Sequence, residues 1–106
     1  MNKPRILIIE DEKLIRWSLR QRFQEEEYLV EEAEDAKAGL AKLGGAVFDL
    51  LMLDYKLPDM TGLQALVSIR QISPASKVLL MTAYGTPEVV QHALQLGAVS
   101  VVHKPL

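Results

Sequence analysis

Leu50-Leu51-Met52-Leu53-Asp54 is a run of four apolar residues closed by a carboxylate. Consecutive apolar residues without polar alternation are typical of a strand that is buried on both faces of a parallel sheet. The run ends at Asp54, where a loop begins, because Lys56, Pro58 and Asp59 follow closely. Ligands of open α/β sheets bind beyond the carboxyl ends of the strands, so Asp54 is well placed for chemistry.

Other apolar runs in the chain also end in polar residues. These runs cover residues 6–9, 78–81 and 101–102, and the polar residues just beyond their ends include Glu10, Asp11, Thr82 and Lys104. With right-handed crossovers, the carboxyl ends of all the parallel strands lie on one edge of the sheet. The sequence therefore predicts that three acids, one hydroxyl and one ammonium converge at that edge.

The rest of the chain alternates short apolar runs with stretches at helical spacing, which is the rhythm of a parallel βα sheet. Strands are predicted at residues 5–9, 28–32, 49–53, 77–81 and 99–103, and helices at 12–26, 35–43, 61–71 and 86–97. In the last helix we expect Val90, Ala93 and Leu94 to face inward. The predicted fold class is α/β, as a single domain over residues 1–106.

Composition narrows the possible functions. The chain has 106 residues, a formal net charge of −2 and no cysteine. This charge gives no electrostatic footprint for nucleic acid or an anionic membrane, and the lack of cysteine excludes disulfides and thiolate metal sites. The N-terminal apolar run is too short for a signal peptide or a membrane span. We expect a cytoplasmic protein that binds neither nucleic acid nor membrane itself.

The converging polar residues indicate a particular chemistry. Glu10, Asp11 and Asp54 would crowd like charges together unless a cation neutralises them. Oxygen ligands from few protein groups suit Mg²⁺, which keeps waters that a phosphoryl oxygen can replace. Thr82 and Lys104 would hold the remaining phosphoryl oxygens. The set favours attack by the Asp54 carboxylate on phosphorus, which gives an aspartyl phosphate.

Five motifs cover nearly the whole chain. They are Ile8-Ile9-Glu10-Asp11-Glu12, Phe48-Asp49-Leu50-Leu51-Met52-Leu53-Asp54, Leu57-Pro58-Asp59-Met60-Thr61-Gly62, Met81-Thr82-Ala83 and Lys104-Pro105. In this order and at these separations they resemble the CheY-like receiver domain of two-component response regulators. Ile15-Arg16-Trp17-Ser18-Leu19 is similar to the nitrogen-regulator branch of sigma-54 transcription activators.

This resemblance implies a fold and partners. The expected fold is a flavodoxin-like, doubly wound five-stranded parallel sheet with strand order 2-1-3-4-5. A histidine kinase is implied as the phosphoryl donor, and a C-terminal output domain or partner, transcriptional in kind, as the receiver of the signal. The Lys104-Pro105 peptide bond is expected to be cis, which only a bond before proline adopts cheaply.

The resemblance also implies roles for single residues. Asp54 would be the phosphoacceptor, and the Mg²⁺ ligands would be Glu10, Asp11, Asp54 and the main-chain carbonyl of Lys56. Thr82 and Lys104 would bind the phosphoryl group. The domain would assist its own phosphorylation and would also hydrolyse the product slowly. It would not be an independent enzyme.

The chain departs from the family pattern at a position linked to signalling. Most receivers carry an aromatic residue three before the lysine, where this chain has Val101. We expect Tyr84, two residues beyond Thr82, to take over part of the switch. Lys56 and Tyr84 would also control the access of water to the phosphorus and slow hydrolysis.

A second departure concerns the end of the chain. Receivers normally carry a fifth helix after the lysine-proline motif, and Leu106 leaves no room for one. We therefore interpret the chain as a C-terminally truncated fragment of a longer protein. Apolar residues beside the first helix should then be exposed, and the isolated chain should self-associate or lose stability.

The sequence also predicts two functional surfaces. Residues that lie off the inward stripe of the fourth helix or close to it in the last strand suggest a homodimer face: Val89, Leu96, Val99 and Val101. Four residues of the first helix are interpreted as solvated or partner-facing surface: Arg16, Trp17, Arg20 and Arg22.

Two other functions remain open. An Mg²⁺-dependent phosphatase with an aspartyl nucleophile, of the haloacid-dehalogenase type, would need a general acid two residues after the nucleophile, where this chain has Lys56. A receiver-like interaction module that never turns over phosphate would bind no Mg²⁺. The complete acid set argues against this module, and Val101 keeps it open.

Overall fold

The computed structural model describes residues 3–106 and contains one five-stranded parallel sheet. Its strands are β1 (Arg5–Ile9), β2 (Leu29–Ala33), β3 (Leu50–Asp54), β4 (Lys77–Thr82) and β5 (Ser100–His103). They lie in the order β2-β1-β3-β4-β5. The flavodoxin-like strand order is therefore confirmed.

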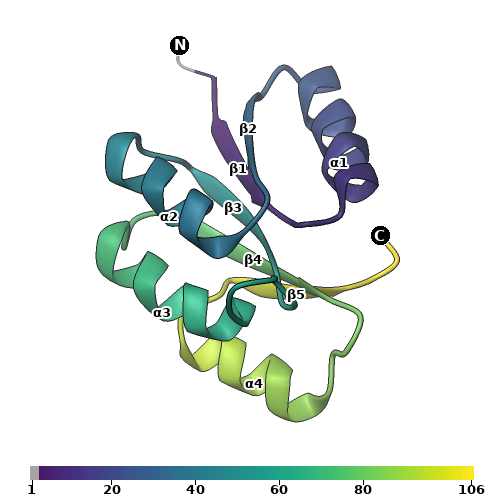
Figure 1. Cartoon of the computed structure of the whole chain (residues 1–106), viewed down its shortest axis with the longest axis vertical. Coiled ribbons are helices and arrows are strands. Elements are labelled where there is room, and N and C mark those ends of the chain that lie inside the picture. Colours follow the sequence, from purple (N-terminus) through teal and green to yellow (C-terminus); the bar gives the residue numbers. More distant parts are fainter. Residues whose placement is uncertain (1–2) are drawn as a thin grey trace.

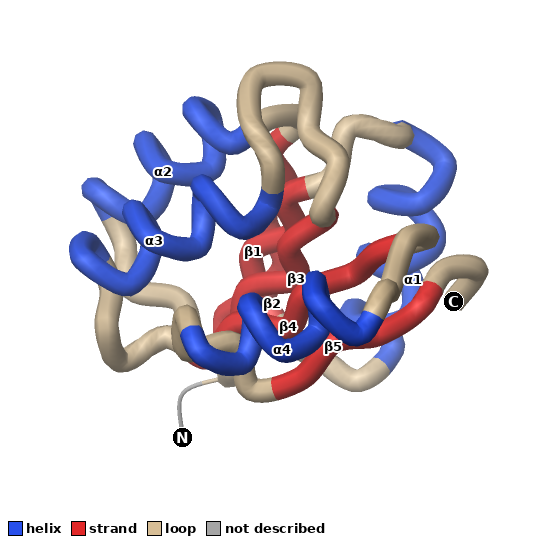
Figure 2. The backbone as a smooth tube through the Cα atoms, turned by 90° about the horizontal axis from the view of Figure 1, so that it is seen from below, coloured by secondary structure: helices blue, strands red, loops and turns tan. Residues whose placement is uncertain are grey.

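Helices cover both faces of the sheet. They are α1 (Lys13–Glu25), α2 (Ala36–Gly45), α3 (Gly62–Ile72) and α4 (Pro87–Gln95). Three of them, α2, α3 and α4, lie side by side on one face, whereas α1 covers the other face alone (Figures 1 and 2). The chain ends near α1. This doubly wound arrangement brings the loops after β1, β3, β4 and β5 to one edge of the sheet.

Local side chains set where most of the helices begin. Asp35 accepts a hydrogen bond from the amide of Ala38 at 2.7 Å, and Thr61 forms a capping box with Gln64. Thr86 caps α4 by accepting from the amide of Val89. These contacts satisfy amides that have no partner within the helix, so the sequence alone locates these starts well.

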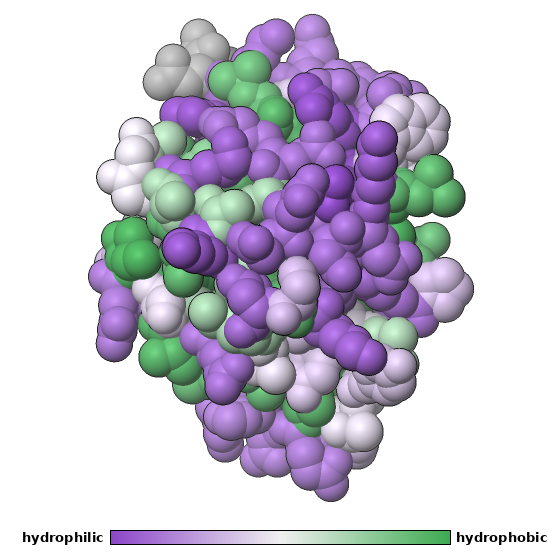
Figure 3. Space-filling model, in the orientation of Figure 1, coloured by the Kyte–Doolittle hydropathy of each residue, from purple (hydrophilic) through white to green (hydrophobic). Residues whose placement is uncertain are grey.

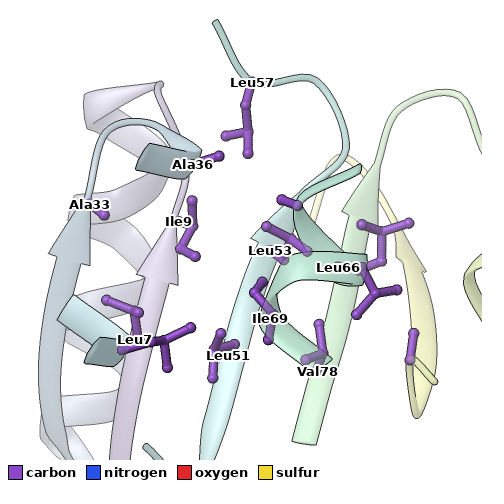
Figure 4. Packing of buried hydrophobic residues seen from close by; sticks show 14 of the residues in the cluster. Leu7, Ile9, Ala33, Ala36, Leu51, Leu53, Leu57, Leu66, Ile69 and Val78 are labelled. Carbon is purple, nitrogen blue, oxygen red and sulfur yellow. The ribbon is translucent and has the colours of Figure 1, made fainter. Parts of the chain in front are cut away.

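The apolar side chains of the strands alternate between two clusters. The larger cluster, under α2, α3 and α4, includes Leu7, Leu53, Leu66 and Ile69, all of them with no exposed surface (Figure 4). The smaller cluster, under α1, has four buried members, Ile6, Ile8, Met52 and Met81. The strands are thus buried on both faces, as their unbroken apolar sequence predicts, but the two faces are packed to different depths.

The orientation of α4 differs from the prediction. Val89 and Leu96 are half-buried and pack against the larger cluster, while Leu94 is 47% exposed. Val89, Ala93 and Leu96 are spaced by four and three residues, which places them on one helical stripe. Leu94 is turned by one residue from Ala93 and therefore points away from the sheet.

The surface in Figure 3 is mostly hydrophilic, and its hydrophobic residues form small separate patches. An apolar groove of about 610 Å³ nevertheless runs along α1. Its lining includes Leu14, Leu19, Phe23, Met52 and Leu106. No helix within residues 3–106 has the length and apolar character needed to cross a membrane.

Candidate functional site

A depression of about 390 Å³ opens at the carboxyl edge of the sheet. Among the residues that line it are Asp11, Asp54, Lys56, Thr82 and Lys104. They come from the ends of β1, β3, β4 and β5 or from the loops that follow. The convergence predicted from four separate apolar runs is therefore present.

Asp54 and Glu10 meet the ammonium of Lys104. The Nζ atom of Lys104 lies 3.0 Å from Oδ1 of Asp54 and 2.5 Å from Oε1 of Glu10. Asp54 is 4% exposed and Glu10 is fully buried, so both ion pairs are shielded from water. The amide of Lys104 donates to the carbonyl oxygen of Thr82 at 2.8 Å, which fixes the start of the lysine side chain beside β4.

The three predicted acids lie close together. Glu10, Asp11 and Asp54 each offer a carboxylate oxygen within 4.8 Å of those of the other two. Asp11 is exposed at the mouth of the depression, and Asp54 lies deeper. A donor set of carboxylate oxygens, open to solvent on one side, fits a hard divalent cation such as Mg²⁺.

Burial and hydrogen bonding act in opposite directions on the pKa values of Glu10 and Lys104. Burial raises the pKa of Glu10 to about 7, although the hydrogen bonds from Lys104 and from the amide of Glu12 lower it. Burial alone would lower the pKa of Lys104, but its bonds to Glu10 and Asp54 outweigh that effect and raise it. A lysine with a raised pKa stays protonated at neutral pH. A cation among the acids would favour the charged form of Glu10.

Thr82 is the last residue of β4, and its side-chain oxygen is already engaged. The Oγ1 atom accepts a hydrogen bond from the amide of Tyr84 at 2.8 Å. The ring of Tyr84 is largely exposed, with the Nζ atom of Lys56 5.9 Å from its centroid. Val101 is half-buried and packs against the larger cluster. The Lys104–Pro105 peptide bond is cis.

The position of Arg16 differs from the prediction. A solvated or partner-facing surface was expected, but Arg16 is 8% exposed. Its Nη1 atom donates to the carbonyl oxygens of Glu10 and Asp11 at 2.7 and 3.0 Å. Sequence periodicity gives no sign of this, because an arginine at a helical position is normally read as exposed. The neighbouring Trp17 is 58% exposed, as predicted.

Comparison with known proteins agrees with this geometry. The family model for the response regulator receiver domain matches residues 6–106 of this chain. The chain belongs to this family. As a receiver domain, it is a signalling module of two-component systems, and the resemblance based on the five motifs is confirmed.

Individual relatives differ in the share of their length that this chain covers. Sporulation initiation phosphotransferase F of Bacillus subtilis is 33% identical over 105 residues, which are 99% of this chain and 85% of that protein. The DNA-binding transcriptional regulator NtrC of Proteus hauseri is 32% identical over 105 residues. The match covers 99% of this chain but 22% of NtrC, so the receiver domain spans about a fifth of this longer relative.

Solved structures of receiver domains share the fold. A CheY-like receiver domain protein from Methanospirillum hungatei has a TM-score of 0.95 and 36% identity, covering 99% of this chain and 84% of that one. The response regulator TrrA of Thermotoga maritima, solved in complex with Mg²⁺ and beryllofluoride, has a TM-score of 0.86 and 32% identity. That match covers 97% of this chain and 88% of TrrA.

Proposed function

We propose that Asp54 is the phosphoacceptor of this receiver domain and takes its phosphoryl group from a histidine kinase. One observation carries the proposal: the largely buried Asp54 carboxylate lines an open depression, 3.0 Å from Lys104 and beside two further acids. A carboxylate held in this way is oriented for attack on phosphorus, and the mouth of the depression leaves space for the donor.

Mg²⁺ would be held by Glu10, Asp11, Asp54 and the main-chain carbonyl of Lys56. Bound there, it would neutralise charge on the transferring phosphoryl oxygens. Glu10 also accepts a hydrogen bond from Lys104 and another from the amide of Glu12 at 3.1 Å. Because both of its oxygens are engaged, Glu10 would reach the cation through water, whereas the exposed Asp11 is free to bind it directly.

In the transfer step, an Oδ atom of Asp54 forms a bond to phosphorus while the bond from phosphorus to the histidine nitrogen of the kinase breaks. The bonding electrons stay on that imidazole nitrogen, which takes up a proton. Lys104 and the hydroxyl of Thr82 would then hold phosphoryl oxygens. Lys104 already lies 3.0 Å from Asp54, so it can follow the new group with a small movement.

Mass spectrometry after incubation with Mg²⁺ and acetyl phosphate tests this proposal. We expect a gain of one phosphoryl group in the wild-type protein and none in Asp54→Asn. Asp49→Asn is the matched control, because Asp49 precedes the same strand at the opposite edge of the sheet. We expect Asp49→Asn to be phosphorylated like the wild type.

The outcomes of this experiment separate the three functional readings. If the wild-type chain gains no phosphoryl group and binds no Mg²⁺, the phosphoacceptor role fails and the interaction module replaces it. Release of phosphate with rapid multiple turnovers would instead favour the phosphatase. A phosphoryl group that persists on Asp54 supports the signalling role.

Tyr84 is proposed as part of the switch, in place of the aromatic residue missing at Val101. The Tyr84 amide donates a hydrogen bond to Oγ1 of Thr82, so a rotation of Thr82 toward a phosphoryl group would release the main chain at Tyr84 and let its ring move. Beryllofluoride-induced amide NMR shifts in α4 should shrink in Tyr84→Ala. An unchanged response would exclude the role.

Lys56 and Tyr84 are proposed to slow loss of the phosphoryl group by limiting the access of water. Both residues line the depression, and the Nζ atom of Lys56 lies 5.9 Å from the centroid of the Tyr84 ring. We expect replacement of both by alanine to shorten the lifetime of phosphorylated Asp54. A wild-type lifetime of only seconds would contradict this role.

The apolar groove along α1 supports the proposal that this receiver domain is part of a longer protein. We propose that a segment after Leu106 covers the groove, and that the parent protein carries an output domain that controls transcription. In isolation, the chain should self-associate through this groove. Sedimentation velocity should detect this association, and Leu14→Glu should weaken it, whereas Val47→Glu, exposed elsewhere, should not. A stable, monodisperse monomer would contradict the groove proposal.

A homodimer through α4 and β5 is proposed for the phosphorylated state. Three of the residues predicted for this face, Val89, Leu96 and Val101, instead pack against the larger cluster. Val99 is exposed as the prediction requires, and the exposed side chain of Leu94 adds apolar surface beside it. Leu94→Asp should abolish any association that beryllofluoride induces, while leaving association through the α1 groove intact. Dimers that persist in Leu94→Asp would assign the contact to another face.

A further inference from the structure

Arg16 has an unusual position for a charged residue of an amphipathic helix. Among the residues of α1, it alone is buried, whereas the neighbouring Trp17 and Lys13 are exposed. Removing a guanidinium from water is unfavourable unless its donors find partners. The contacts of Arg16 therefore indicate what its burial serves.

The guanidinium of Arg16 binds two separate parts of the molecule. Its Nη1 atom donates to the consecutive carbonyl oxygens of Glu10 and Asp11 at 2.7 and 3.0 Å. Its Nε and Nη2 atoms face the carboxylates of Glu32 and Glu34 at 3.4 and 3.7 Å. One side chain thus ties the turn after β1 to the end of β2.

Hydrogen bonds from two of its own amides also hold the turn that bears the acids. The amide of Glu10 donates to the carbonyl oxygen of Ala33 at 3.0 Å, and the amide of Glu12 donates to the Glu10 carboxylate at 3.1 Å. The carbonyl groups of Glu10 and Asp11 have Arg16 as their partner. The direction in which the two acid side chains leave the main chain depends on the orientation of these peptide groups.

We propose that Arg16 is a positioning residue for the acid pair: its guanidinium fixes the peptide groups of Glu10 and Asp11 and so holds their carboxylates in the arrangement that receives the cation. This inference rests on the proposed binding of Mg²⁺. An arginine is needed because its planar fork can serve two carbonyls and a carboxylate at once, whereas the single nitrogen of a lysine cannot span them.

Arg20 provides a matched control. It lies one turn further along α1, and its Nη1 atom forms an ion pair with the same Glu32 at 2.5 Å. It has no contact with the turn after β1 among its hydrogen bonds and ion pairs in the described structure. Arg20→Lys therefore perturbs the link between α1 and β2 and leaves the acid pair alone.

The experiment compares Arg16→Lys with Arg20→Lys in an MgCl₂ titration followed by amide NMR shifts. We expect the dissociation constant of Mg²⁺ to rise by about tenfold or more in Arg16→Lys, as for other residues that orient metal ligands. In Arg20→Lys we expect a change of less than about twofold. Equal changes in both variants would overturn the proposal and make Arg16 a simple anchor of α1.

A second readout does not depend on the metal. Amide hydrogen exchange at Glu10, relative to Ile8 in the same strand, should accelerate in Arg16→Lys and stay unchanged in Arg20→Lys. If the wild-type chain shows no response to Mg²⁺, the proposed function fails, and this exchange ratio still tests whether Arg16 holds the turn. An unchanged ratio would overturn the positioning role.

Folding of the variants completes the test. Arg16→Gln supplies a second replacement, neutral and with a shorter donor, and should show the same loss of Mg²⁺ affinity. Both variants should keep the wild-type circular dichroism spectrum. If neither folds, Arg16 stabilises the whole domain and the separate positioning role is overturned.

Discussion

The two faces of the sheet are packed very differently. Under α2, α3 and α4 lie sixteen buried residues, whereas four lie under α1. The α1 face instead carries charged groups, because Arg16 and Glu10 are both buried on or beside it. The first face therefore holds most of the apolar burial that stabilises the domain, and the second face holds polar contacts that arrange the site.

This separation suits the proposed function. The proposed site for a cation and a phosphoryl group needs charged side chains, and burying these costs free energy unless they are paired. Placing them at the edge of the sheet beside the thinner face leaves the larger cluster undisturbed.

Truncating one leucine on each face of the sheet should reveal the largest difference in the free energy of unfolding. Leu66→Ala removes a side chain with no exposed surface from the larger cluster, so the free energy of unfolding should fall by about 3–4 kcal/mol. Leu19→Ala, on the half-buried α1 side, should lower it by about 1 kcal/mol. Urea denaturation measures both values. Equal losses would mean that α1 is packed as firmly as α3.

The buried acid of the α1 side should make stability depend on pH in the absence of Mg²⁺. Native Glu10 keeps its proton up to about pH 7, whereas the unfolded chain releases it above about 4.5. In that window the unfolded state binds fewer protons, so the free energy of unfolding should fall as pH rises, by about 3 kcal/mol in total. Glu10→Gln should flatten this part of the profile. A slope that persists in Glu10→Gln would assign it to another group.

Gly62, at the start of α3, tests how closely this helix packs on the sheet. A Cβ atom there would lie 2.6 Å from the carbonyl oxygen of Asp54 and 2.9 Å from Leu80. We expect Gly62→Ala to lower the free energy of unfolding by about 2 kcal/mol and to weaken phosphorylation of Asp54. Gly44→Ala is the control, because its added atom meets nothing within 4 Å and should stabilise α2 by about 0.5 kcal/mol.

Asp59 should show a smaller effect, because its contacts are near the surface. It accepts hydrogen bonds from the amides of Ala36 and Lys37, which join the loop after β3 to the start of α2. Slight desolvation raises the pKa of Asp59, but these backbone bonds outweigh it and lower the pKa overall. Asp59→Ala should reduce the free energy of unfolding by about 1 kcal/mol above pH 4, and less in acid. A loss that is the same at pH 3 and pH 7 would exclude the charge as its cause.

Much of the fold follows from local sequence. The unbroken apolar runs of β1 and β3 predict buried strands, and the caps at Asp35, Thr61 and Thr86 locate helices, since these signals act within a few residues. Predicted strand ends differ from the observed ones by one residue at most. The gathering of Asp54 with Lys104 also follows, because parallel strands share one carboxyl edge.

Other features depend on contacts between distant parts of the chain. The ion pair between Lys104 and Glu10 joins residues that are 94 positions apart, and no local pattern encodes its geometry. The burial of Arg16 arises because the turn after β1 and the end of β2 both present acceptors to it. The rotation of α4 that exposes Leu94 is likewise set by packing against α3 and β5.

The amino-acid sequence therefore fixed the order of the elements and the chemical groups at the carboxyl edge of the sheet, because hydrophobic periodicity and capping are short-range effects. Tertiary packing fixed how unequally the two faces are filled and which charged residues are buried. Burial of a charge such as that of Arg16 is stable only where several acceptors meet, and that meeting exists only once the whole sheet has formed.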